Sequence, residues 1–133
     1  MSNLVGKWKG DHSENMENFL KAMGVGDAAK KVAESDNANV EISVSDDGTW
    51  TIDTVGGIMK DSKISFKLGV PFEDARPGGK TEKIVATLED GKLITKPVDN
   101  PDGPSAFWQV VDGHAMLTIT KGDIIAKRFF NKA

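Results

Sequence analysis

The sequence predicts an all-β domain, a meander of nine or ten antiparallel strands that curls into a barrel, with a helical segment between the first and second strands. Three observations predict this fold. Turn signals of the Asp-Gly type recur along the chain, apolar residues alternate with polar ones between the turns, and only residues 15–35 carry helical periodicity. A long meander leaves two exposed edge strands unless the sheet closes on itself, which favours a barrel.

The composition is that of a small acidic protein without cysteine. The chain has 133 residues and a formal net charge of -3, so one domain spanning residues 1–133 is expected. The charge argues against a nucleic-acid partner, for which Lys and Arg gather on one face. The lack of cysteine excludes disulfides and thiolate metal sites. Because the chain shows no run typical of a signal peptide or a membrane span, we expect a soluble cytoplasmic protein.

The strands are expected where apolar residues alternate between turns, beginning with residues 4–10, which Trp8 anchors. The residues that the alternation places on one apolar face are Val40, Ile42, Val44, Trp50, Ile52, Ile64, Phe66, Leu68, Ala115, Leu117 and Ile119. The hairpin signals between strands include Asp47-Gly48, Asp90-Gly91, Asp102-Gly103, Asp112-Gly113 and Gly122-Asp123. With six phenylalanines, three tryptophans and no tyrosine to fill a barrel of this size, an interior cavity is expected.

A first helix is expected directly after the first strand. Its apolar residues fall at i, i+3, i+4 and i+7 and so share one stripe of the helix surface: Met16, Phe19, Leu20 and Met23. Ser13 or Asn15 can cap its start. Gly24 or Gly26 can end it in a left-handed conformation that most other residues avoid.

A second short helix is expected from Asp27. Its inner side offers small or branched apolar groups that include Ala33, while Lys30 and Lys31 lie on its outer side. Neither helix is stable alone at this length, so the pair must lie on the strands, either as a lid or as core packing. For the two lysines the alternatives are contact with an anionic membrane and a simply solvated face.

Arg128 interrupts the apolar pattern of the last strand. Alternation places it on the same face as Ile124, Ala126 and Phe130. If that face lines the cavity, the guanidinium requires an anion or a hydrogen-bonded network, and its planar fork suits a carboxylate. If the register is the other way, Arg128 is solvated. Alternation alone leaves both registers open.

Several segments resemble a cytosolic fatty-acid-binding protein, in the same order along the chain: Gly6-Lys-Trp8, residues 13–26, residues 64–69 with Phe72-Glu-Asp74, Val111-Asp-Gly113 and Lys127-Arg-Phe-Phe130. The resemblance implies a ten-stranded antiparallel up-and-down β-barrel, or clam, with a helix-turn-helix lid between the first two strands. It implies a carrier of long-chain fatty acids or similar lipids in an interior cavity, with no enzymatic activity and no cofactor. We expect this carrier to be a monomer.

The resemblance also implies how a ligand is held. The family usually grips the carboxylate with two arginines and a tyrosine; the second arginine corresponds to Arg128, the tyrosine to Phe130 and the first arginine to Trp108. Apolar rings thus replace two of the three polar groups. Near the portal, Met59 and Met16 stand where aromatic residues are common, either as more adaptable lining or as neutral replacements. The expected ligand-binding residues are Arg128, Phe130, Trp108, Met16, Phe19, Ala33, Met59 and Leu117.

Three other functions remain open on the sequence alone. A carrier of the same fold for a retinoid, a sterol-like lipid or another non-carboxylate ligand is favoured by the two replaced polar groups. A secreted lipocalin has an early Gly-x-Trp like residues 6–8, but it usually has a longer chain and a signal peptide. A lipid esterase requires a nucleophile and a base. The acidic pairs at 46–47, 73–74 and 89–90 coincide with expected turns, and the two histidines lack a second ligand at metal spacing.

Overall fold

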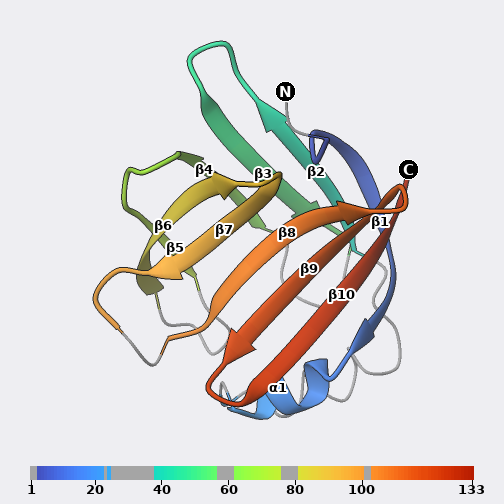
Figure 1. Ribbon diagram of the computed structural model, residues 1–133, viewed down its shortest axis with the longest axis vertical. Helices are drawn as coiled ribbons and strands as arrows, with labels where there is room; N and C mark the ends of the chain where they lie inside the picture. The colour runs from blue at the N-terminus through green and yellow to red at the C-terminus, as the bar shows by residue number, and fades with distance from the viewer. Residues whose placement is uncertain (1–2, 23, 25–37, 57–61, 76–80, 101–102) are drawn as a thin grey trace.

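Ten strands and one helix make up the part of the chain that the computed structural model describes, residues 3–22, 24, 38–56, 62–75, 81–100 and 103–133. In chain order they are β1 (Gly6–Glu14), α1 (Met16–Ala22), β2 (Asn39–Val44), β3 (Thr49–Val55), β4 (Ser62–Lys67), β5 (Phe72–Ala75), β6 (Thr81–Glu89), β7 (Lys92–Pro97), β8 (Ser105–Val111), β9 (His114–Lys121) and β10 (Ile124–Lys132). The strands wrap round a common interior, and α1 lies across one end (Figure 1).

The strands form one sheet in the order β4-β3-β2-β1-β10-β9-β8-β7-β6-β5. Neighbours pair in antiparallel fashion, and β1 pairs with β10, which joins the two ends of the chain. In the described residues β4 and β5 are the unpaired edges. Side chains bring these edges together, because the rings of Phe66 and Phe72 stack with centroids 4.8 Å apart. The result is the expected ten-stranded antiparallel barrel, which is nearly closed.

Two of the expected Asp-Gly turns, Asp90-Gly91 and Asp112-Gly113, join adjacent strands tightly. The first pair has φ of 52° and 79°, and the second has φ of 53° and 80°. Positive φ at both central residues matches the twist of the flanking strands, and Asp-Gly adopts it at low cost. A longer connection links β7 to β8. Asp102 of the turn expected at 102–103 lies outside the described residues, while the N–H of Gly103 donates to the carbonyl of Asn100 at 3.0 Å. Pro104 has no N–H with which to extend the ladder towards this signal.

The core lies inside the barrel, where the alternating apolar residues of the strands meet. Its buried residues are Leu4, Trp8, Val40, Ile42, Trp50, Ile52, Phe66, Ala86, Leu93, Trp108, Ala115 and Phe130. Leu68 is instead 38% exposed, because β4 ends at Lys67 and Leu68 lies in the following turn. Within the core, the indole N–H of Trp8 donates to the carbonyl of Leu4 at 2.9 Å, which satisfies a buried polar group.

The first strand is longer than the expected residues 4–10. β1 continues to Glu14 because its second half pairs with β10, where Ser13 lies opposite Arg128. The register shifts just after Gly10, which is the mark of a β-bulge. The polar residues of this second half do not alternate with apolar ones, so the sequence pattern ends before the strand does.

Helix α1 begins directly after Asn15, one of the two expected caps. Asn15 has φ of 60°, and its carbonyl accepts a hydrogen bond from the N–H of Phe19 at 3.3 Å. Its side-chain amide donates to the carbonyl of Ile125 at 2.9 Å and so ties the helix to β10. The helix is followed by Gly24, which has φ of 84° and donates its N–H to the carbonyl of Lys21. Both ends therefore lie at expected positions, although the side-chain oxygen of Asn15 accepts from the side chain of Asn18 and not from a backbone N–H of the helix.

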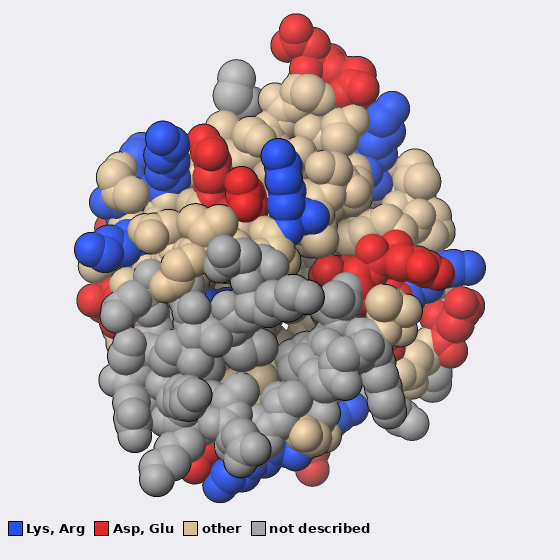
Figure 2. Space-filling model, turned by 180° about the vertical axis from the view of Figure 1, so that it is seen from behind, with Lys and Arg blue, Asp and Glu red and all other residues tan. Residues whose placement is uncertain are grey.

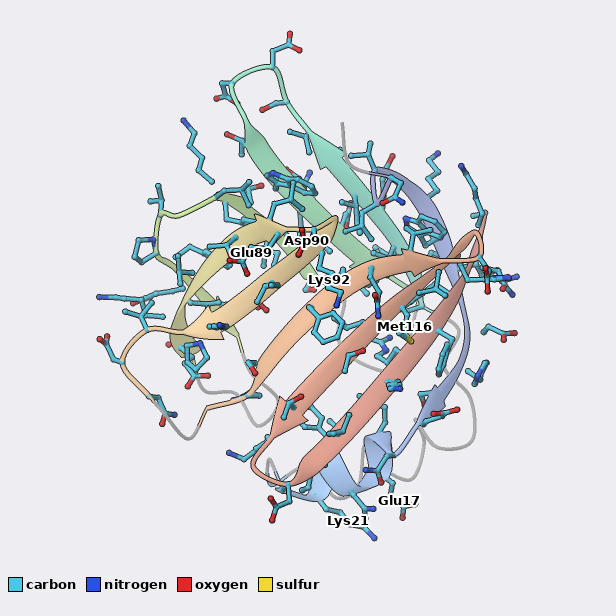
Figure 3. All side chains as sticks on the ribbon, in the orientation of Figure 1. Glu17, Lys21, Glu89, Asp90, Lys92 and Met116 are labelled. Carbon is cyan, nitrogen blue, oxygen red and sulfur yellow. The ribbon has the colours of Figure 1, made fainter. Side chains whose placement is uncertain are left out.

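The outer side of α1 is polar and its inner side is apolar. Glu17 and Lys21 form an ion pair at 3.1 Å, and both point away from the barrel (Figure 3). The buried residues of the helix are Met16, Phe19 and Leu20. The second helix expected from Asp27 lies outside the described residues. Among those that are described, no helix is long and apolar enough to cross a membrane.

Candidate ligand-binding site

A cavity of about 260 Å³ lies inside the barrel, lined by α1 and by strands β3 to β10. Its volume is near the lower end of the roughly 300–1,000 Å³ typical of small-molecule sites. It far exceeds the roughly 10–15 Å³ that one water molecule requires. Most of the lining residues are apolar. The small number of aromatic residues predicts such a cavity, and its lining suits an apolar ligand.

Arg128 lines this cavity and is the one cation among its described lining residues. The strand register decides the question that alternation left open. Ala126 and Phe130 on the same face of β10 are buried, whereas Ile125 on the other face is 53% exposed. The guanidinium carbon of Arg128 lies 5.3 Å from the centroid of the Phe130 ring. The cavity thus carries a fixed positive charge with an aromatic ring beside it.

Trp108 and Phe130 pack against each other. Their ring centroids are 5.2 Å apart and their planes are tilted by 36°. Trp108 is 7% exposed and lines the cavity. Phe130 is 1% exposed, and it lies outside the described lining. Phe130 thus lies in the core in contact with Trp108 and Arg128, and its expected contact with a ligand stays a prediction.

Met16 and Phe19 of α1, two of the expected ligand-binding residues, both line the cavity. Together with Leu20 and Ala126 they form a buried cluster that is separate from the main core of the barrel. The helix therefore covers one end of the cavity through its own small set of contacts with β10.

Leu117, another expected ligand-binding residue, lines the cavity and lies opposite Trp108 in the β8–β9 ladder. Ala33, Met59, Lys30 and Lys31 lie outside the described residues. Ligand contact by the first two and membrane contact by the two lysines stay predictions.

Sequence reasoning missed a group of polar residues in the lining: Thr54, Ser62, Asp74 and Thr95. The pair at 73–74 was expected to lie in a turn, and this interpretation is wrong. Both residues belong to β5, which pairs with β6. The strand was missed because it is only four residues long and follows a Gly-Val-Pro sequence that reads as a turn. Its alternation with Phe72 is the signal that could have found Asp74.

The outer surface of the barrel shows mixed charge. In Figure 2 acidic and basic side chains are interspersed over the described part of one face, which is unlike the basic face that binds nucleic acid. His12 stacks on Phe129 with ring centroids 4.4 Å apart, and Nδ1 of His114 is 2.9 Å from the side-chain oxygen of Asn131. The described residues contain no cluster of three metal-ligating side chains.

Comparisons with known proteins agree with this geometry. The family described as "Lipocalin / cytosolic fatty-acid binding protein family" matches residues 5–118. Fatty acid-binding protein homolog 6 of Caenorhabditis elegans is 34% identical over 128 residues, which cover 94% of this chain and 93% of the relative. Human fatty acid-binding protein 12 is 34% identical over 131 residues, 97% of this chain and 91% of the relative.

A solved structure of a Schistosoma mansoni fatty acid binding protein in complex with arachidonic acid superimposes with a TM-score of 0.86. It is 25% identical, and the superposition covers all of this chain and 98% of the other. These proteins are named for binding a lipid, and none of the three is named for an enzymatic activity. Because the family match spans most of the sequence and these relatives align over nearly all of it, the chain belongs to the lipocalin and cytosolic fatty-acid binding protein family.

Proposed function

We propose that this protein binds one long-chain fatty acid non-covalently in its interior cavity and carries it through the cytoplasm. The observation that carries the proposal is the position of Arg128, a cation in the wall of a mostly apolar cavity. A hydrocarbon tail gains about 0.8 kcal/mol for each methylene removed from water. The tail supplies most of the binding free energy, and Arg128 selects a carboxylate head group.

The contribution of Arg128 can be bounded. A hydrogen bond to a charged group is worth about 1.5–3 kcal/mol, which corresponds to roughly ten- to a hundredfold in affinity. Trp108 and Phe130 supply neither charge nor hydroxyl, so this single guanidinium carries the recognition that the family usually divides among three groups. The acid should therefore bind more tightly than the alcohol of equal chain length by about that factor.

Calorimetric titration of a fatty acid and its matching alcohol tests the role of Arg128. Arg128→Leu should weaken the acid by about ten- to a hundredfold and leave the alcohol nearly unchanged. Lys127→Leu is the matched control, because it removes the same charge from the neighbouring position on the outer face of β10. An acid-to-alcohol ratio that is equal in wild type and Arg128→Leu would show that Arg128 does not read the head group.

That outcome would favour a second function, a carrier of a non-carboxylate lipid such as a retinoid. The buried Trp108–Phe130 pair supports it, since both rings stand where polar groups usually hold a carboxylate. A retinol-type alcohol would then bind at least as tightly as the fatty acid in the same titration.

We also propose that α1 and the segment after it form a helix-turn-helix lid over the cavity. Support comes from the separate cluster through which Met16, Phe19 and Leu20 contact β10. Replacement of residues 15–35 by a Gly/Ser linker should leave a folded β protein with faster ligand exchange. Circular dichroism and stopped-flow ligand displacement measure the two effects. Loss of the β signal would mean that the helices belong to the core.

The remaining proposals concern the whole protein. We propose that residues 1–133 form one domain and that the protein acts as a monomer, which sedimentation tests.

We further propose that Lys30 and Lys31 make transient contact with anionic membranes. Two lysines near such a surface contribute about 1 kcal/mol each. The double change Lys30→Glu/Lys31→Glu should slow transfer to anionic vesicles at low salt, whereas a matched pair of charge reversals on β1, at 7 and 9, should not. If the Lys30→Glu/Lys31→Glu variant transferred ligand as fast as the β1 variant, steering by Lys30 and Lys31 would be ruled out.

A further inference from the structure

The cavity has a second polar group on the wall opposite Arg128. Thr54 on β3, Ser62 on β4 and Asp74 on β5 line the same space as Arg128. In the sheet order β5 follows β10 by five positions, which is half of a ring of ten strands. Thr54 and Ser62 lie directly opposite each other in the β3–β4 ladder. These three residues form what we call the acidic end of the cavity.

The short strand β5 holds Asp74 in this position. Asp74 shares its face of the strand with Phe72, whose ring stacks on Phe66 of β4, while Glu73 between them is exposed. In the β5–β6 ladder Asp74 lies opposite Glu82, so two carboxylates share one face of the sheet. Directly opposite like charges destabilise a strand pair. The side-chain amide of Asn100 donates to Glu82 at 2.8 Å, and a further donor from a ligand would stabilise the charge of Asp74 in the same way.

An unsubstituted hydrocarbon tail cannot supply such a donor. Where it reaches the acidic end it displaces water from polar groups and offers no hydrogen bond in return, which is unfavourable. A carboxylate has about four acceptor positions, so Asp74 can accept a bond from a ligand in addition to those it already makes. A ligand hydroxyl also accepts a bond from Thr54 or Ser62, whereas an ammonium group only donates and is costly to desolvate.

We infer that the cavity selects a fatty acid with a hydroxyl group on its chain, held by Arg128 at the carboxylate and by Asp74 at the hydroxyl. The inference rests on the proposed function and names the ligand class more narrowly. The charge of Asp74 in the lining excludes a dicarboxylic acid, because the second carboxylate of that ligand would face it. Specificity thus comes from a cation and an anion on opposite walls of one cavity.

Titration calorimetry with a matched set of ligands tests this inference. The set contains a saturated fatty acid, derivatives of equal length with the hydroxyl at mid-chain or at the terminal carbon, and the dicarboxylic acid. The hydroxy acid whose hydroxyl group reaches Asp74 should bind wild type about ten- to a hundredfold more tightly than the saturated acid without a hydroxyl. The dicarboxylic acid should bind most weakly.

Asp74→Leu should abolish the preference for the hydroxy acid, and Asp74→Asn, which keeps the side-chain volume, should reduce it. Glu73→Leu, the matched control on the exposed face of β5, should keep it. A plain acid that binds wild type as tightly as every hydroxy acid would overturn this inference and leave the proposed function intact. A preference that survives both Asp74 changes would also overturn it. Failure of all the acids to bind would overturn the proposed function as well.

Discussion

The guanidinium carbon of Arg128 lies 5.3 Å from the centroid of the Phe130 ring, two residues further along β10. The same ring packs against Trp108, which lines the cavity. A cation over an aromatic face gains about 0.5–2 kcal/mol. Phe130 is not among the lining residues, but it influences the site because its ring packs against Trp108 and stabilises the charge of Arg128.

A double-mutant cycle should detect this interaction. Phe130→Leu and Arg128→Leu should show a coupling free energy of unfolding of about 0.5–2 kcal/mol in urea denaturation. The neighbouring ring of Phe129 stacks on His12 on the outer face. Phe129→Leu is therefore the control and should be additive with Arg128→Leu. Additivity of the Phe130 and Arg128 changes would show that the ring does not stabilise the charge.

The stability of the turn between β2 and β3 should depend on pH. The side-chain hydroxyl of Ser45 donates to Asp47, and the N–H of Thr49 donates to the same carboxylate oxygen at 3.1 Å. These hydrogen bonds, with that of Ser45 first, lower the pKa of Asp47 from 3.8 to about 2. The acidic tip at the top of Figure 2 lies at the position of this turn.

A lowered pKa means that the charged carboxylate stabilises the folded turn. The contribution should be complete above about pH 4 and should be lost as the pH falls through about 2. NMR titration of the Asp47 carboxyl carbon measures it. Ser45→Ala should raise the midpoint, while Lys67→Gln should change it less because that amine lies 4.0 Å away. A wild-type midpoint near 3.8 would contradict the assignment.

Much of the barrel could be predicted from local chemistry. Asp90-Gly91 and Asp112-Gly113 form tight turns because those residues accept positive φ, and that preference is visible in the chain itself. Trp50 and Ile52 are buried as their alternation predicts. The direction of Arg128 could not be predicted in the same way. A strand has two faces, and only its pairing with β1 and β9 decides which one is inside.

The acidic end of the cavity escaped prediction for a related reason. Asp74 follows Glu73, and two adjacent acids after Gly-Val-Pro are typical of a turn. The strand that contains them is stabilised by its ladder with β6 and by the stacking of Phe72 on Phe66, contacts between residues distant in sequence. Periodicity in the sequence reveals the apolar lining residues. The polar lining residues cannot be distinguished from exposed surface residues until the tertiary structure is known.

The attachment of α1 to β10 gives a prediction about ligand exchange. The amide of Asn15 donates to the carbonyl of Ile125 at 2.9 Å, and its side-chain oxygen accepts from the amide of Asn18 at 2.6 Å. Asn15→Ala removes both bonds and also strains the positive φ, so it should lower stability by about 1–2 kcal/mol. If α1 covers the entrance, ligand release in stopped-flow displacement should accelerate.

Asn15→Gly separates the two effects. Glycine accepts the φ of 60° but cannot make the side-chain bonds, so the variant should lose less stability than Asn15→Ala and still release ligand faster than wild type. Release rates equal to wild type in both variants would mean that this end of the helix does not control exit.

Replacement of Trp108 tests whether one arginine limits affinity for a carboxylate. Trp108→Arg places a second guanidinium in the lining, two strands from Arg128 with Leu117 between them, and removes a ring that packs on Phe130. Without ligand the variant should melt at a lower temperature than wild type, because two cations then share a cavity of low polarity. A fatty acid neutralises both, so the rise in melting temperature on binding should exceed that of wild type. Trp108→Leu, which loses the ring without gaining charge, should show no such increase, and an equal rise in both variants would contradict the role of charge.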